Sequence, residues 1–79
     1  MQPIIDLINK IKWDKKENPE DYSLFYSDRF MDEFKEIKLT EIKRTEDSFL
    51  VVEREGEEVY IPTHRIHYVK KKGVIVWKR

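Results

Sequence analysis

This chain of 79 residues contains no cysteine, two glycines, three prolines and no long apolar run. The lack of cysteine excludes disulfides and thiolate metal sites, and two histidines alone do not make a structural zinc site. Two glycines are too few for a glycine-rich phosphate loop. No segment approaches the ~20 apolar residues of a membrane-spanning helix, and residues 1–6 lack the features of a signal peptide. We therefore expect one soluble, cytoplasmic domain over residues 1–79, with no cofactor, no metal and no membrane contact.

Charge is abundant but unevenly distributed. Charged residues make up 41% of the chain, and 16 Lys and Arg balance 16 Asp and Glu. From Pro62 onward there are six Lys and Arg, both histidines and no acidic residue. A basic surface that also carries His, Tyr and Trp suits a phosphate-bearing ligand with stackable bases, which points to RNA. The alternative is a lysine-rich edge strand that only resists aggregation.

The N-terminal part predicts one helix and one strand. Apolar residues recur at helical spacing over residues 3–12, where Pro3 suits the first turn. The polar residues 14–21 predict a loop, and residues 22–27 have the alternation of a β-strand. Residues 30–34 stay ambiguous, with a short helical turn as one option.

The C-terminal half predicts two β-hairpins. Each joins two β-favouring runs through a two-residue turn that ends in glycine: residues 48–54 with 57–61 across Glu55-Gly56, and residues 67–71 with 74–77 across Lys72-Gly73. Glycine supplies the positive φ that such turns require. The two turns use both glycines of the chain, which strengthens both predictions.

Sharp bends are expected near Thr40 and at residues 62–65. Residues 37–52 also echo residues 61–76 at an offset of 24, and both segments read as strand, bend, strand. Strands joined by such bends would curl an antiparallel sheet. We therefore predict an α+β fold with one N-terminal helix on a curled, mainly antiparallel sheet of about five or six strands, which could approach a small barrel.

Catalytic arrangements have little support in the sequence. Ser23, Ser27 and Ser48 lack the Gly-x-Ser-x-Gly elbow of serine hydrolases. Two-histidine phosphoesterases carry each histidine in a His-x-Thr/Ser motif, whereas His64 begins His-Arg-Ile and His67 begins His-Tyr-Val. Their odd spacing would direct them to opposite faces of a strand, although a bend between them could bring them together. An RNA phosphoesterase using both histidines therefore stays an alternative to a protein that is not an enzyme.

Cations and planar side chains for RNA gather around the Pro62 bend. RNA binding requires cations for phosphates and planar groups for bases. The bend could aim His64 and Arg65 outward together, and an arginine can hold a phosphate through two hydrogen bonds. The candidate RNA-binding residues are Arg29, His64, Arg65, Lys71, Trp77 and Arg79. Several have structural alternatives, since a tryptophan can anchor the core and the Lys70–Lys72 run can be a solvated strand end.

At these residues the sequence resembles a small archaeal family of uncharacterised proteins described as the RNA cyclic-group end recognition domain. Four motifs carry the resemblance over nearly the whole chain: Ile11-Lys12-Trp13-Asp14, Tyr26-Ser27-Asp28-Arg29, Ile61-Pro62-Thr63-His64-Arg65-Ile66 and Val76-Trp77-Lys78-Arg79. Their order and spacing together are more specific than any one of them.

The resemblance implies a non-catalytic RNA-binding module. Its ligand would be RNA with a phosphorylated end, a 2′,3′-cyclic phosphate or a related processed end. Such a module would act in RNA processing, and its partners would include RNA-end-processing enzymes. Carried over to this chain, the resemblance implies end-phosphate contacts by Arg29, His64 and Arg65, and supporting or flanking contacts by Trp77 and Arg79.

Two points qualify this resemblance. Family members often carry a glycine after the Asp-Arg pair, where this chain has Phe30, and this departure makes the role of Arg29 less secure. Trp13-Asp14 is equally consistent with a structural lock between helix and sheet. A protein–protein interaction module of an RNA-processing assembly, using an exposed strand edge or apolar patch, remains the alternative to RNA binding.

Overall fold

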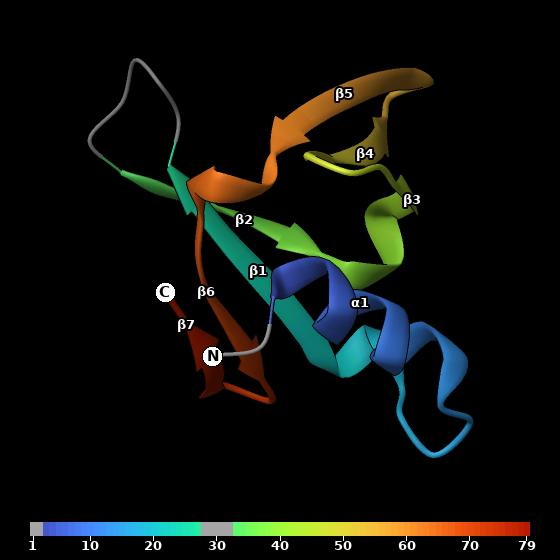
Figure 1. Ribbon diagram of the computed structural model, residues 1–79, viewed down its shortest axis with the longest axis vertical. Helices are drawn as coiled ribbons and strands as arrows, with labels where there is room; N and C mark the ends of the chain where they lie inside the picture. Colours follow the sequence, from blue (N-terminus) through green and yellow to red (C-terminus); the bar gives the residue numbers. More distant parts are fainter. Residues whose placement is uncertain (1–2, 28–32) are drawn as a thin grey trace.

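The computed structural model describes residues 3–27 and 33–79, which form an α+β fold with one α-helix and seven strands (Figure 1). The elements are α1 (Ile4–Trp13), β1 (Tyr22–Ser27), β2 (Phe34–Lys38), β3 (Ile42–Thr45), β4 (Phe49–Arg54), β5 (Glu57–Pro62), β6 (Ile66–Lys71) and β7 (Val74–Lys78), with short 3₁₀ turns η1 (Pro19–Asp21), η2 (Leu39–Glu41) and η3 (Thr63–Arg65). The strands make two antiparallel sheets, ordered β2-β1-β6-β7 and β3-β4-β5. The predicted α+β class with an N-terminal helix is confirmed.

Helix α1 covers the core with one apolar stripe. Ile4, Ile8 and Ile11 are buried because they recur at helical spacing on one side. The helix lies across β1 and below β3 in Figure 1, and Lys12 Nζ donates a hydrogen bond to the carbonyl of Ile42 at 2.9 Å. Within the described residues, no helix is long and apolar enough to cross a membrane.

The four-stranded sheet turns one face to the core. A single row crosses all four strands, since Ile37 pairs with Leu24, Leu24 with Val69, and Val69 with Trp77. All four side chains are buried in one hydrophobic cluster. Alternate residues of a strand point to opposite faces, so the row that begins at Phe25 faces away from the core.

The three-stranded sheet closes the other side of the core. Leu50 pairs with Ile61, and Ile42 pairs with Val52. These four residues belong to the same hydrophobic cluster as the row of the larger sheet. Val51, between Leu50 and Val52, is also fully buried but lies outside that cluster. The outer face of this sheet is therefore covered by side chains as well.

The 3₁₀ turns η2 and η3 move the chain between the two sheets. Turn η2 leads from β2 to β3, and η3 leads from β5 back to β6. The N–H of Ile42 closes η2 and the N–H of Ile66 closes η3, each with the carbonyl of the first turn residue. The bends predicted near Thr40 and at residues 62–65 are thus confirmed, and they are separated by the predicted offset of 24.

Both predicted hairpins are present, with turns of the predicted residues. Glu55 and Gly56 have φ of 51° and 80°, and Lys72 and Gly73 have φ of 50° and 83°. Positive φ at both central residues is the geometry of a type I′ turn, which matches the twist of the flanking strands. In each turn a charged residue, and not only the glycine, adopts the left-handed conformation.

The arrangement of strands differs in detail from the prediction. The described residues form seven strands in two curled sheets that do not close into a barrel, where about five or six strands in one sheet were expected. The reason is that η2 and η3 each transfer the chain to a different sheet. Of the ambiguous residues 30–34, residues 30–32 lie outside the described part, and Phe34 begins β2.

Candidate nucleic-acid interface

The Pro62 bend is held in place by the C-terminal residue. Arg79 Nη2 donates to the carbonyl of Thr63 at 2.8 Å, and Arg79 Nε donates to the carbonyl of Ile66 at 3.2 Å. The first carbonyl belongs to the first residue of η3 and the second to the residue that follows η3, so one guanidinium group braces the whole turn. The same group lies 5.9 Å from the ring of Trp77, which is buried in the core. Trp77 and Arg79 therefore meet at the bend as structural supports.

Arg65 opens onto a small pocket at this bend. The pocket has a volume of about 170 Å³ and is lined by Tyr26, Ser27, Val59, Tyr60, Ile61, Pro62 and Arg65. Arg65 is half-buried, and it makes no hydrogen bond or ion pair with any residue in the described ranges 3–27 and 33–79. A partly desolvated guanidinium with no acidic partner among the described residues can bind an external anion. The two tyrosines supply planar surfaces beside it.

The two histidines have different surroundings. His64 is exposed on η3, whereas His67 is half-buried on β6. His67 Nε2 lies 2.9 Å from Ser27 Oγ, at the end of β1. Neither histidine is among the described residues that line the Arg65 pocket. Arg29, the remaining candidate, lies outside the described residues.

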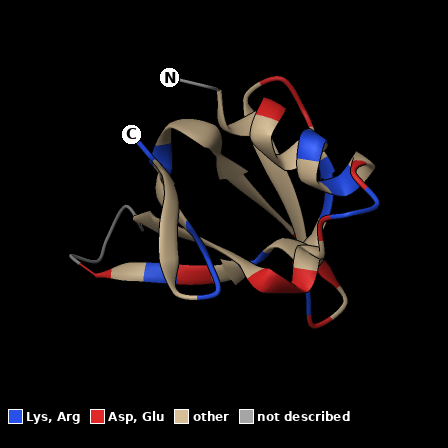
Figure 2. Cartoon of the chain, turned by 90° about the horizontal axis from the view of Figure 1, so that it is seen from below, with Lys and Arg blue, Asp and Glu red and all other residues tan. Residues whose placement is uncertain are grey.

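Lys71 is not brought to the bend. It lies at the opposite end of β6, where its Nζ is 3.2 Å from Glu17 Oε2 and 5.5 Å from the ring of Tyr22. The pKa of Glu17 is lowered by hydrogen bonds from Tyr22 and then Lys71, and the pKa of Lys71 is raised by its hydrogen bond to Glu17. Figure 2 shows the two basic ends of the β6–β7 hairpin well apart.

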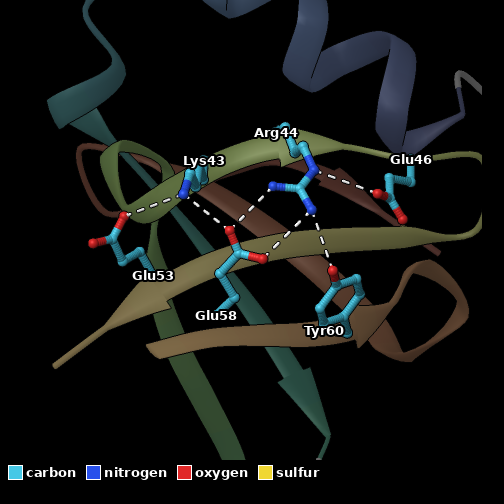
Figure 3. Close-up of polar contacts among 6 residues, drawn as sticks. All are labelled: Lys43, Arg44, Glu46, Glu53, Glu58 and Tyr60. Atoms are coloured by element: carbon cyan, nitrogen blue, oxygen red, sulfur yellow. Dashed lines mark hydrogen bonds and ion pairs between the residues drawn. The ribbon is translucent and has the colours of Figure 1, made fainter. Parts of the chain in front are cut away.

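Basic residues of the three-stranded sheet are paired internally (Figure 3). Lys43 Nζ lies 2.9 Å from Glu58 Oε2 and 3.9 Å from Glu53 Oε2. Arg44 donates to both oxygens of Glu58 and to the hydroxyl of Tyr60. The pKa of Glu58 is lowered by the hydrogen bonds from Lys43 and Arg44. These cations are already neutralised, which distinguishes them from Arg65.

Two aromatic residues depart from what the sequence indicated. Trp13 is 86% exposed, so it does not lock the helix to the sheet; Lys12 makes that connection instead. Tyr60 was not among the candidate residues from the sequence, although it precedes the buried Ile61 on β5 and alternation places the two on opposite faces of the strand. In the part of the chain that is described, no group of three or more His, Asp or Glu side chains could hold a metal ion.

Comparisons with known proteins agree along the whole chain. The family model of the MJ1316 RNA cyclic group end recognition domain matches residues 1–79. A UPF0248 protein of Saccharolobus solfataricus is 33% identical over 79 residues, covering 96% of this chain and 95% of that protein. A UPF0248 protein of Metallosphaera sedula is 30% identical over 76 residues, covering 96% of this chain and 91% of that protein. No solved structure matches the chain.

Proposed function

The chain belongs to the MJ1316 RNA cyclic group end recognition domain family, and we propose from this membership that it is a non-catalytic module that binds processed RNA ends, among them 2′,3′-cyclic phosphates. The resemblance drawn from the four sequence motifs is confirmed by the match over residues 1–79. The proposed site is the Arg65 pocket at the Pro62 bend.

The observation that carries this proposal is Arg65, which makes no ion pair with the described residues and lines a pocket with two tyrosines. A 2′,3′-cyclic phosphate carries one negative charge shared by two free oxygens, and a planar guanidinium matches two such oxygens. Ser27 adds a hydroxyl that can donate a hydrogen bond. Tyr26 or Tyr60 can stack on the terminal base or ribose, as aromatic side chains do in single-stranded RNA recognition.

A non-catalytic role is supported by the positions of the histidines. General acid–base cleavage of a phosphodiester requires two groups within hydrogen-bond reach of the reacting atoms. His67 is engaged with Ser27, and His64 projects from η3 as an exposed side chain. A phosphate held by Arg65 would thus lie in a pocket that neither histidine lines.

The test compares one short RNA with three alternative 3′ ends: hydroxyl, linear phosphate and 2′,3′-cyclic phosphate. We expect the cyclic end to bind most tightly in fluorescence anisotropy. Arg65→Ala should weaken that binding about 10- to 100-fold, because charge-assisted hydrogen bonds contribute about 1.5–3 kcal/mol. Arg54→Ala is the matched control, since Arg54 pairs with Glu41 at the other end of the β4–β5 hairpin. It removes the same charge and should leave end preference unchanged.

Other outcomes would replace the proposal with a different one. Equal binding of the three ends would reduce it to general RNA binding. No binding at low or moderate salt would favour the protein-interaction alternative. Turnover of the cyclic-phosphate RNA that is lost in His64→Ala and His67→Ala would show a phosphoesterase. If the ends are recognised, we propose that the protein acts in the cytoplasm beside RNA-end-processing enzymes.

A further inference from the structure

The outer face of the four-stranded sheet carries a cluster of aromatic rings. Phe25 on β1 pairs across the strands with Tyr68 on β6, and their rings are stacked with centroids 4.7 Å apart and planes at 16°. Phe34 on β2 meets Tyr68 edge to face at 5.5 Å and is 51% exposed. The pair lies beside the buried pair of Leu24 and Val69, so by strand alternation it faces away from the core.

Lysines lie beside these rings. Lys70 Nζ is 5.3 Å from the ring centre of Phe25 and 5.7 Å from that of Tyr68. A hollow of about 430 Å³ adjoins Phe25; its lining residues include three lysines and three acidic residues, namely Lys38, Lys70, Lys72, Glu20, Asp21 and Glu36. Lys72 is paired with Asp21 at 3.9 Å. Lys38 and Lys70 make no ion pair with the described residues.

The two sheets cover their outer faces in different ways. The three-stranded sheet uses the ion-pair network around Glu58, in which every cation has an internal anion (Figure 3). The four-stranded sheet instead presents aromatic rings beside Lys38 and Lys70, which make no ion pair with the described residues. Cross-strand aromatic pairs stabilise a sheet, but stability alone requires neither an open hollow at the ring nor lysines that have no acidic partner among the described residues. Rings beside lysines are the combination that binds bases and phosphates of single strands.

A chain of contacts connects this face with the Arg65 pocket. The ring of Phe34 lies 4.9 Å from the ring of His67, and His67 lies 2.9 Å from Ser27 Oγ, which lines the pocket. Phe25 precedes Ser27 by two residues on β1, which is about 7 Å along the strand. A nucleotide chain that ends in the pocket can therefore continue onto the aromatic face.

We propose that the outer face of the four-stranded sheet is a second RNA subsite, on which Phe25 and Tyr68 stack the bases that precede the bound end. The ligand is single-stranded RNA, and its phosphates are contacted by Lys70 and Lys38. This subsite rests on the proposed RNA-binding function and adds the requirement for unpaired nucleotides next to the end. Stacking is tolerant of base identity, so the subsite reads length and single-strandedness and not sequence.

The test is a length series of oligouridylates, from a mononucleotide to a pentanucleotide, each with a 2′,3′-cyclic phosphate. Wild-type affinity is expected to rise with length. Phe25→Leu removes the ring but keeps apolar bulk, and it should weaken binding of the longer oligonucleotides at least about fivefold while leaving the mononucleotide unchanged. Tyr68→Phe keeps the stack and should bind as the wild type does. Trp13→Leu is the control, because it removes an 86% exposed ring from α1. Ring protons of Phe25 and Tyr68 should shift on titration in NMR spectra.

The possible outcomes test this subsite separately from end recognition in the Arg65 pocket. Length-dependent binding that is lost in Phe25→Leu, with equal affinity for all three ends, would keep the subsite and overturn end recognition. Affinity that does not depend on length, or equal effects of Phe25→Leu and Trp13→Leu, would overturn the subsite alone. Ring protons of Phe25 and Tyr68 that do not shift with any oligonucleotide would also overturn the subsite. That result would indicate that this face binds a protein. If Phe25→Leu does not fold, Lys70→Gln is compared with Lys15→Gln as its control. Lys70→Gln should lower the slope of log affinity against log salt concentration by about 0.7.

Discussion

The two tryptophans show how the position of one residue decides its role. Trp77 pairs with Val69 on the core face of the four-stranded sheet and is 9% exposed, whereas Trp13 is 86% exposed. The buried stripe of α1 includes Ile8 and Ile11. Trp13 follows Ile11 by two residues, which places it on a different side of the helix. The sequence alone did not show which of the two tryptophans is buried in the core.

This difference predicts opposite effects of removing the two indoles. Trp77→Ala should lower the free energy of unfolding by about 3–5 kcal/mol, because it leaves a cavity in the core. Trp13→Ala should change it by less than about 0.5 kcal/mol, as exposed substitutions usually do. Urea denaturation followed by circular dichroism measures both. Failure of Trp77→Ala to fold would agree with this expectation, and similar losses in the two variants would contradict it.

At the scale of elements, the two hairpins are set by their turns. Glu55 and Lys72 hold φ of 51° and 50°, a region that Asn and Gly adopt far more readily than Glu or Lys. Each hairpin therefore carries local strain at the residue before its glycine. The strands compensate for this strain by pairing over six positions in β4–β5.

Relief of the strain in the first turn should stabilise the fold. Glu55→Asn is expected to raise the free energy of unfolding by about 0.5–1 kcal/mol and the Tm by about 2–8 °C. Gly56→Ala should lower the free energy by about 1–2 kcal/mol, and an added Cβ there would meet no described atom within 4 Å, so the loss would report the backbone alone. Thermal melts of both variants measure this. A destabilised Glu55→Asn would show that the Glu55 side chain matters more than its φ.

At the scale of the whole molecule, folding mixes charges that the sequence separates. The acid-free C-terminal segment meets the acidic body where Lys71 contacts Glu17 and Lys72 contacts Asp21. Figure 2 shows basic and acidic segments interleaved along the structure. Arg65 and Lys70 make no ion pair with the described residues, so tertiary structure decides which cations have an internal anion.

The ion pairs predict how stability depends on pH. The pKa values of Glu17 and Glu58 are lowered below 4.5 by their hydrogen bonds, so each carboxylate stabilises the fold above pH 4.5 and loses this effect as the pH falls through its folded-state pKa. The pKa values of Lys43 and Lys71 are raised above 10.5, so their contribution is complete below that pH and is lost above it.

Stability should therefore be level near neutral pH and fall in acid and strong base. Glu58→Gln should make the acid decline shallower in denaturation curves, whereas Glu57→Gln should not, because Glu57 makes no ion pair with the described residues. Added salt should reduce the difference between wild type and Glu58→Gln, since exposed pairs are screened. Identical acid limbs for wild type and Glu58→Gln at low salt would refute this account.

The sequence by itself determined the local elements. The apolar stripe of α1, the alternation of β1, the glycines of both hairpins and the bend at Pro62 are encoded by residues within a few positions of one another, and the structure has all of them. The family was also evident from short motifs. These features depend on backbone preferences and spacing, which a sequence displays directly.

Tertiary structure alone decided the sites. Arg79 braces η3 across 13 to 16 residues, Phe25 stacks on Tyr68 through the pairing of β1 with β6, and Lys71 is drawn to Glu17 instead of the bend. The Arg65 pocket combines residues of β1, β5 and η3. Such contacts depend on which strands pair and which side chains find partners, and local periodicity carries no record of either.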